Sequence, residues 1–482
     1  MTLQRDLAWQ NIELMYRSSI AHQFARYALS LNYQMLPKAV VHQAKRCLLD
    51  ALGCAIGAYE APGYPICEAV AKELGGPEEA TVFCSGLHTS ACNATLVNSF
   101  LVRFLDYNDS GGGGHNSDSI PAILAVSERE KAGGKDLLTS IVISYELGAR
   151  VRDSIELGRV RDPITGLSPI EDRGWTQDIR GGLNMPPALG KLMGLDEGQI
   201  ANAIGSCACA SLPLHILDAH REENVMRKNL RFGLVAYEAI LFCMLAKKGF
   251  TGPVRIVEGD GGWRKTIMQG GMDLERLVDF SGWRILQTRH KYLCANGTTH
   301  GHIYATLAIV KEHDLKPEDI ASVRIKACLR EASHTTTFAK KYPRNAESAD
   351  HSAFYANALA IKERAFGPDS IKPEKFTDPV VLDLIEKITV EADPTMPAVS
   401  HEGKSEITTK DGRRFEKHVV TPHGYRDDPL SDSELEEKFR EMAAKHMEEK
   451  KVKEIFDTIW NVEKIDNVSN LVKLMVFQSR VT

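Results

Sequence analysis

The sequence predicts a mostly helical protein that carries a smaller α+β domain. Apolar and small residues recur at three- and four-residue steps through most of the first 275 residues, which is the period of amphipathic helices. Short β-favouring runs then appear, and the pattern becomes helical and charged again after about residue 430. Because 482 residues exceed what one hydrophobic core supports, we expect a helical domain over residues 1–275, a smaller α+β domain over residues 276–430, called the lid domain below, and a further helical segment over residues 431–482.

The segment from 38 to 63 is typical of the predicted helical domain. Val40, Ala44 and Cys47 start an apolar stripe at helical spacing, and Pro37 and Gly63 bracket it. Small residues dominate these helices, so their axes can approach closely. Similar stripes run through residues 117–134, 134–155, 185–212 and 229–250.

The predicted lid domain combines short strands with helices. Residues 321–329 and 387–393 read as strands, and residues 405–420 read as a hairpin. Asp411 and Gly412 stand between the two alternating halves of that hairpin, where a tight turn requires such residues. Helical patterns at 299–313 and 350–363 lie between the strands.

Charge, cysteines and apolar runs limit the partners. There are 59 basic and 64 acidic residues, a formal charge of -5, and no basic block that would neutralise nucleic-acid phosphates. The ten cysteines form no CxxC pair, which favours free thiols in a reducing compartment. Asp6 and Glu13 stand in an N-terminus without a secretory apolar core, and the apolar run at 239–246 stops at Lys247. We therefore expect a cytoplasmic protein that binds neither nucleic acid nor a membrane.

A glycine-rich loop is the first candidate functional segment. Asp106, Asp109 and His115 surround four consecutive glycines, residues 111–114, directly before a predicted helix. No Lys-Ser/Thr pair follows the glycines and no predicted strand precedes them, so a phosphate loop does not fit. Two interpretations stay open, a mobile surface loop and a substrate-entry loop whose acid and imidazole transfer protons.

The start of the following helix lies close to this loop. Residues 117–119, Ser-Asp-Ser, are candidate N-caps, and Pro121 suits the first helical turn. This places His115 just ahead of a helix N-terminus, which favours a carboxylate.

Two further clusters contain basic side chains. The first holds Arg221, Arg227, Lys228 and Arg231; it is either a solvated helix face or a site that grips carboxylates through guanidinium groups. The second contains Lys291, Tyr292, His300 and His302 around a glycine turn. Because this segment has neither HExxH nor a carboxylate at ligand spacing, we expect no metal site.

Several motifs together resemble the MmgE/PrpD family over nearly the whole chain. The loop LDYNDS with His115, Ser117 and Asp118 is similar to the family's active-site loop, and GFTGPVRIVEGDGGW is similar to its most specific block. LCANGTTHGHIYATLAI, ADHSAFYANALA and PLSDSELEEKFREMA resemble its later blocks. The resemblance implies that residues 1–275 and 431–482, from both chain ends, form one large helical domain beside the smaller lid domain. It also implies a homodimer and a substrate bound between the domains.

The resemblance also implies the site residues. It carries the catalytic positions onto Asp106, His115, Lys228 and His300, with Ser110 beside them. Lys228 and the arginines would hold the carboxylates of the substrate. The candidates for substrate binding are Ser110, Asp109, Arg221, Arg227, Arg231 and Lys291.

The resemblance implies a hydro-lyase of the 2-methylcitrate dehydratase type, which removes water from a tricarboxylic hydroxy acid without a cofactor. His115 or Asp106 would take the proton, and a protonated His300 would assist the leaving hydroxyl. Trp175 stands where the decarboxylase branch has a histidine, which favours dehydration. A cis-aconitate decarboxylase, an iminodisuccinate epimerase and a non-catalytic carboxylate-binding protein on the same fold stay open as alternatives.

Overall fold

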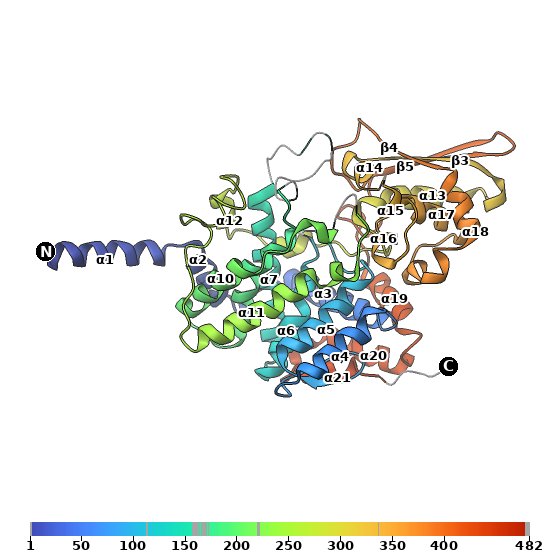
Figure 1. Ribbon diagram of the computed structural model, residues 1–482. Coiled ribbons are helices and arrows are strands. Elements are labelled where there is room, and N and C mark those ends of the chain that lie inside the picture. Colours follow the sequence, from blue (N-terminus) through green and yellow to red (C-terminus); the bar gives the residue numbers. More distant parts are fainter. Residues whose placement is uncertain are drawn as a thin grey trace.

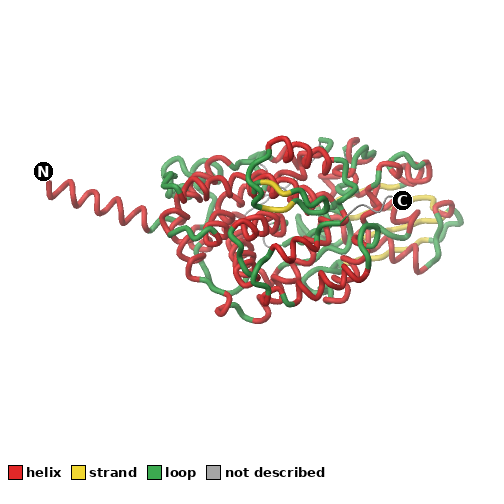
Figure 2. The backbone as a smooth tube through the Cα atoms, turned by 90° about the horizontal axis from the view of Figure 1, so that it is seen from below, coloured by secondary structure: helices red, strands yellow, loops and turns green. Residues whose placement is uncertain are grey.

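The computed structural model describes residues 2–111, 114–156, 162, 164, 171, 173–218, 222–335 and 337–477. Helices dominate, and the longer strands gather in one sheet at the end of the molecule opposite the N-terminal helix α1 (Figure 1, Figure 2). Helix α1 (Thr2–Arg17) projects from the body. The predicted fold class, with a helical domain formed by both chain ends and a smaller α+β lid, is confirmed.

The helical domain is built around α3 (Lys38–Gly57) and α5 (Ala91–Phe104). The predicted stripe of α3, with Ala44, Cys47 and Leu48, is fully buried, and this helix packs against α5 and α7. The small side chains of α3 and α5 allow these close contacts, because a bulkier residue would separate the axes. The other helices of this part are α2 (Ile20–Ser30), α4 (Gly63–Leu74), α6 (Ile120–Arg129), α7 (Gly134–Glu156), α9 (Gly181–Leu192), α10 (Glu197–Ala210), α11 (Arg231–Lys247) and α12 (Leu274–Leu277); strands β1 (Ala80–Thr81) and β2 (His88–Thr89) form a small antiparallel pair.

One helical stretch, Met226–Lys247, is long and apolar enough to cross a membrane by length and composition. It consists of a 3-10 turn, Met226–Leu230, and α11. Helix α11 packs against α5, α9 and α10, so it is a core helix of this domain.

The lid contains a four-stranded mixed sheet in the order β4-β3-β5-β6. Strand β3 (Ile320–Ala327) runs parallel to β4 (Ile388–Ala392) and antiparallel to β5 (Gly403–Thr409), which forms a hairpin with β6 (Arg414–Val419). Gly412 has φ +88° in the hairpin turn, as the Asp-Gly pair predicts. Helices of this domain are α13 (His300–Glu312), which packs on β5 and β6, α14 (Leu329–Thr335), α15 (Phe338–Lys341), α16 (Ala346–Ala349), α17 (Ala353–Glu363) and α18 (Pro379–Glu386).

The last helices return to the helical domain. Helix α19 (Asp432–Ala443) packs on α3, α20 (Glu449–Trp460) contacts both, and α21 (Ser469–Leu474) contacts α6. This return agrees with the expected order of helical, mixed and helical segments. The boundaries at residues 275 and 430 stay predictions.

Candidate active site

A cavity of about 630 Å³ lies where the two domains meet. The helical domain lines it with residues of the 103–115 segment, the 176–180 turn and Arg231. The other wall comes from the 289–298 segment, Arg330, His351 and residues 397–401. Side chains more than 200 residues apart in the sequence therefore face one space.

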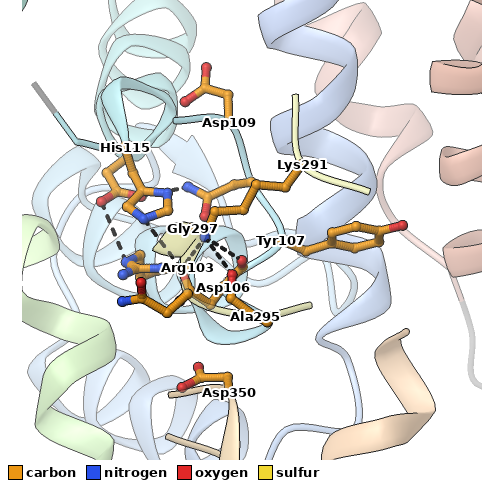
Figure 3. A network of polar contacts seen from close by, with 12 residues as sticks. Arg103, Asp106, Tyr107, Asp109, His115, Lys291, Ala295, Gly297 and Asp350 are labelled. Atoms are coloured by element: carbon orange, nitrogen blue, oxygen red, sulfur yellow. Dashed lines mark hydrogen bonds and ion pairs between the residues drawn. The ribbon is translucent and has the colours of Figure 1, made fainter. Parts of the chain in front are cut away.

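Asp106 occupies a strained turn directly after α5. Its φ is +45°, in the left-handed region that non-glycine residues rarely adopt, and its carboxylate is buried. Oδ1 accepts hydrogen bonds from Arg103 Nη1 at 2.5 Å and from Lys291 Nζ at 2.8 Å (Figure 3). Burial alone would raise the pKa of Asp106, but the charges of Arg103 and Lys291 outweigh it and hold the pKa well below its ordinary value. Asp106 is therefore an anion shared by several cations.

His115 lies against the same oxygen, with Nε2 3.2 Å from Oδ1 of Asp106. Burial, followed by the charges of Arg103 and Lys291, lowers the pKa of His115 well below 6.5, so the imidazole is neutral. Since the carboxylate is ionised, Nε2 carries the proton and Nδ1 holds the lone pair. Nδ1 is buried and has no hydrogen-bond partner among the described residues. A neutral imidazole with one nitrogen held by a carboxylate is arranged as a general base.

The described ends of the glycine loop, Gly111 and Gly114, line the cavity. Gly111 and Gly114 have φ of +107° and +103°, which other residues rarely adopt. A Cβ on Gly114 would lie 3.3 Å from Nη1 of Arg180, whose Nη2 donates to the carbonyl of His115. Residues 112 and 113 lie outside the described residues.

The expected helix cap is absent. Ser119 precedes α6 without a capping hydrogen bond, because residues 116–119 form a 3-10 turn whose side chains bond elsewhere. Ser117 Oγ donates to Asp109, and Asn108 Nδ2 donates to both Ser117 and Asp118. These contacts hold the loop in place, and Pro121 lies in the first turn of α6 as predicted.

Lys228 lies behind the cavity wall. Its fully buried ammonium donates to Asp350 at 2.6 Å and lies 3.3 Å from Nδ1 of His351. His351 does line the cavity, and its Nδ1 is 3.9 Å from Oδ2 of Asp106. His351 therefore lies between Lys228 and Asp106. Lys228 does not line the cavity, but its charge helps to lower the pKa of Asp106.

The cavity carries an excess of positive charge. Among its described lining residues seven are cationic and four are carboxylates, which leaves three positive charges when the histidines are neutral. Arg231 is buried between Asp178 and Asp218, at 2.9 Å from each. The cations are Arg103, Arg152, Arg180, Arg231, Arg289, Lys291 and Arg330, and the carboxylates are Asp106, Glu171, Asp178 and Asp218.

Arg289 differs from the other cations of the cavity. Within the described part of the chain it has no carboxylate partner, and its guanidinium lies 5.1 Å from the ring centroid of Tyr425. Its backbone exchanges two hydrogen bonds with Ser110, each at 2.8 Å. Arg289 is thus a fixed positive charge that faces the cavity and is available to an anion.

Some predicted site residues are not brought into the cavity. Asp109 is buried away from it and accepts from Tyr145 and Ser117 instead, and its carboxylate points away from Asp106 (Figure 3). His300 is also buried outside the cavity, and Nε2 donates to the carbonyl of Ala295. Burial and then the charge of Lys291 lower the pKa of His300 well below 6.5, so it does not fit the role of a proton donor. Arg227 is half-buried outside the cavity lining, and Arg221 lies outside the described residues.

Other residues of the cavity went unrecognised in the sequence. Arg103 lies on the buried face of α5, and His351 and Arg289 stand in segments read as helix or loop. A charged residue within an apolar stripe signals a buried ion pair, and this signal could have identified Arg103. Arg289 and His351 offer no such local signal.

Among the residues that the structure describes, one group of side chains has ligand atoms close enough for a metal ion. Atoms of Asp106, Asp350 and His351 lie within 4.8 Å of one another. The ammonium groups of Lys228 and Lys291 already bond these carboxylates, so a metal cation would have to displace them. The expectation of no metal stays a prediction.

Two domains around a cationic cavity with a neutral imidazole are typical of an enzyme for small anionic substrates. The family models for the MmgE/PrpD N-terminal domain and the MmgE/PrpD C-terminal domain match residues 22–275 and 294–463. The chain belongs to the MmgE/PrpD family.

Curated relatives match the chain along most of its length at low identity. It is 22% identical to cis-aconitate decarboxylase of Homo sapiens, over 96% of this chain and 95% of that protein. It is 22% identical to cis-aconitate decarboxylase of Aspergillus terreus, over 97% and 98%. It is 24% identical to 2-methylcitrate dehydratase of Escherichia coli, over 81% and 83%. These relatives are lyases, which supports an enzyme of this family.

Proposed function

We propose that this protein is a hydro-lyase of the 2-methylcitrate dehydratase type, which removes water from a tricarboxylic hydroxy acid. The observation that carries the proposal is the neutral His115, which lines the cavity and whose Nε2 lies 3.2 Å from the carboxylate of anionic Asp106. Elimination of water begins with removal of a C–H proton beside a carboxylate, and a neutral imidazole accepts such a proton. The excess of positive charge in the cavity suits a substrate with several carboxylates.

Protein groups supply the proposed chemistry. Nδ1 of His115 takes the proton, and the cations around the cavity stabilise the charge that develops on the adjacent carboxylate. The hydroxyl leaves as water with a proton from a second group, a role we assign to His351. His351 lies 3.9 Å from Asp106, with Nε2 3.4 Å from Asp218.

Decarboxylation of cis-aconitate is the second candidate. It is favoured by the decarboxylase relatives, which align with 95–97% of this chain, whereas the 2-methylcitrate dehydratases align with 81% of it.

An assay with a panel of acids separates the two functions. The purified protein is mixed with 2-methylcitrate, citrate and cis-aconitate, and alkene absorbance and released CO₂ are measured. Dehydration gives an alkene from a hydroxy acid without CO₂, whereas decarboxylation releases CO₂ from cis-aconitate. If neither product forms from any acid, both proposals are wrong. Activity that a chelator abolishes and a metal restores would contradict catalysis without a metal.

Arg289→Gln is expected to raise KM for the tricarboxylic acid at least tenfold, while kcat changes less. A hydrogen-bonded charge pair is worth about 1.5–3 kcal/mol, and binding that is equal in ground and transition states affects KM alone. Initial rates over a range of acid concentrations measure the effect.

Arg152→Gln is the matched control for that variant. Arg152 lines the same cavity, but its guanidinium already bonds Asp153 at 2.7 Å. Equal KM values for the two variants would show that Arg289 does not bind the substrate.

A further inference from the structure

Helix α19, in the C-terminal part of the chain, places a buried cation close to the candidate active site. Ser431 caps this helix in a capping box, and Leu435, Phe439 and Met442 form its buried stripe against α3. Lys438 lies on the same inward side and is 1% exposed. A lysine at this depth requires partners for its ammonium, because burying an unpaired charge is costly.

The ammonium of Lys438 uses all three of its hydrogens. It donates to Oδ1 of Asp50 at 2.6 Å, to the carbonyl of Tyr107 at 2.8 Å and to the carbonyl of Lys291 at 2.7 Å. It also lies 3.8 Å from the centroid of the Tyr107 ring. Asp50 balances the charge, whereas the two carbonyls belong to the backbone beside the cavity.

Both carbonyls adjoin the Asp106–Lys291 pair. Tyr107 follows Asp106 directly, and the side chain of Lys291 donates to the carboxylate and to the carbonyl of Asp106. The same two segments are joined at a second point by the backbone bonds between Ser110 and Arg289. Lys438 is absent from the cavity lining, so it does not touch a substrate there.

We infer that Lys438 is a positioning residue. It fixes Asp106 and Lys291 at the separation at which Oδ1 of Asp106 contacts both Lys291 and His115. The inference rests on the proposed role of Asp106 and His115. It gives the C-terminal motif PLSDSELEEKFREMA a function, because this motif supplies Lys438 from a helix outside the cavity. Loss of the three bonds would let the two segments move apart and weaken the field of Lys291 at His115.

The test removes the three hydrogen bonds of Lys438 without leaving an unpaired buried charge. In Lys438→Met with Asp50→Asn both charges are removed together, whereas Lys438→Met alone would strand the Asp50 carboxylate and destabilise the fold. Asp50→Asn alone leaves the buried ammonium of Lys438 without its counter-charge and is expected to lower the free energy of unfolding, but Lys438 keeps its hydrogen bonds to both carbonyls. Arg440→Met is the control on the same helix, since Arg440 pairs with Glu436 and Glu449 at the surface.

We expect the double variant to fold and to lose at least tenfold in kcat, whereas Asp50→Asn and Arg440→Met stay within a few-fold of the natural protein. In a plot of kcat against pH, the acidic limb of the double variant is expected to lie at higher pH than that of the natural protein. A displaced Lys291 would no longer lower the pKa of His115. A change confined to stability would not move this limb.

An NMR titration of the histidines in the same variants measures the pKa of His115 without any substrate. We expect His115 to titrate at higher pH in the double variant than in Asp50→Asn. If the natural protein converts no acid, the proposed function fails, and the NMR titration still decides the role of Lys438. An unchanged titration and an unchanged kcat in the folded double variant would overturn the inference. Should that variant not fold, Lys438→Leu with Asp50→Asn gives the same test, because a leucine side chain likewise donates no hydrogen bond to the two carbonyls.

Discussion

Replacing His115 by alanine is expected to lower kcat at least ~100-fold, the loss typical of removing a general base. In the proposed mechanism Nδ1 of His115 takes the proton while Asp106 holds Nε2 at 3.2 Å, and alanine has no group to replace the imidazole. The free energy of unfolding is expected to change by less than about 1 kcal/mol, because the side chain lies in a loop and leaves Nδ1 unpaired. Steady-state rates and thermal unfolding measure the two quantities.

Chemical rescue makes this test specific to the imidazole. Added imidazole is expected to restore part of the rate of His115→Ala, since the variant leaves a space beside Asp106. His418→Ala on the lid surface is the control and should keep its rate. A folded His115→Ala protein whose rate stays within tenfold of the natural protein would show that another group takes the proton.

Replacing Asp106 by asparagine is expected to abolish measurable turnover and to lower the free energy of unfolding by about 3–5 kcal/mol at neutral pH. The substitution removes the anion that Arg103, Lys291 and His115 share, so that buried cations face a neutral amide. Denaturant unfolding and the lyase assay measure the two losses. Asp109→Asn is the matched control, because this neighbouring buried carboxylate faces Tyr145 and Ser117 instead of a cation.

The loss of stability has a defined pH dependence. The pKa of Asp106 is lower in the folded protein than in the unfolded chain, so its contribution is present in full above the unfolded pKa of about 4. That contribution decreases as the pH falls toward the folded pKa. The difference between the natural protein and Asp106→Asn is therefore expected to narrow below about pH 4. A difference that stays constant through this range would mean that Asp106 is not held as an anion.

Local patterns were sufficient to predict most of the fold. The stripe through Ala44 and Cys47 specified a buried helix, and the pair Asp411-Gly412 specified the hairpin turn between β5 and β6. Both signals depend on the period of side chains along one segment and on the φ that one turn requires. Such requirements are met by neighbours in the sequence, so they can be read from it.

The candidate site was predictable only where its residues stand in one unusual segment. Asp106 and His115 flank the glycine run, and the structure brings both into the cavity. The caps expected at 117–119 were wrong, since those side chains bond the adjacent loop instead of the helix end. Several groups competed for the same donors, and local spacing does not rank them.

Contacts between distant segments depend on the packing of the two domains. Lys228 was predicted beside the substrate, but Asp350 and His351, more than 120 residues later, hold it behind the wall. The roles of Arg289 and Lys438 could not be predicted, because their partners are a ring, a carboxylate and backbone carbonyls from distant parts of the chain. Buried charges are placed by the partners that satisfy them, and those partners meet only when the chain has folded.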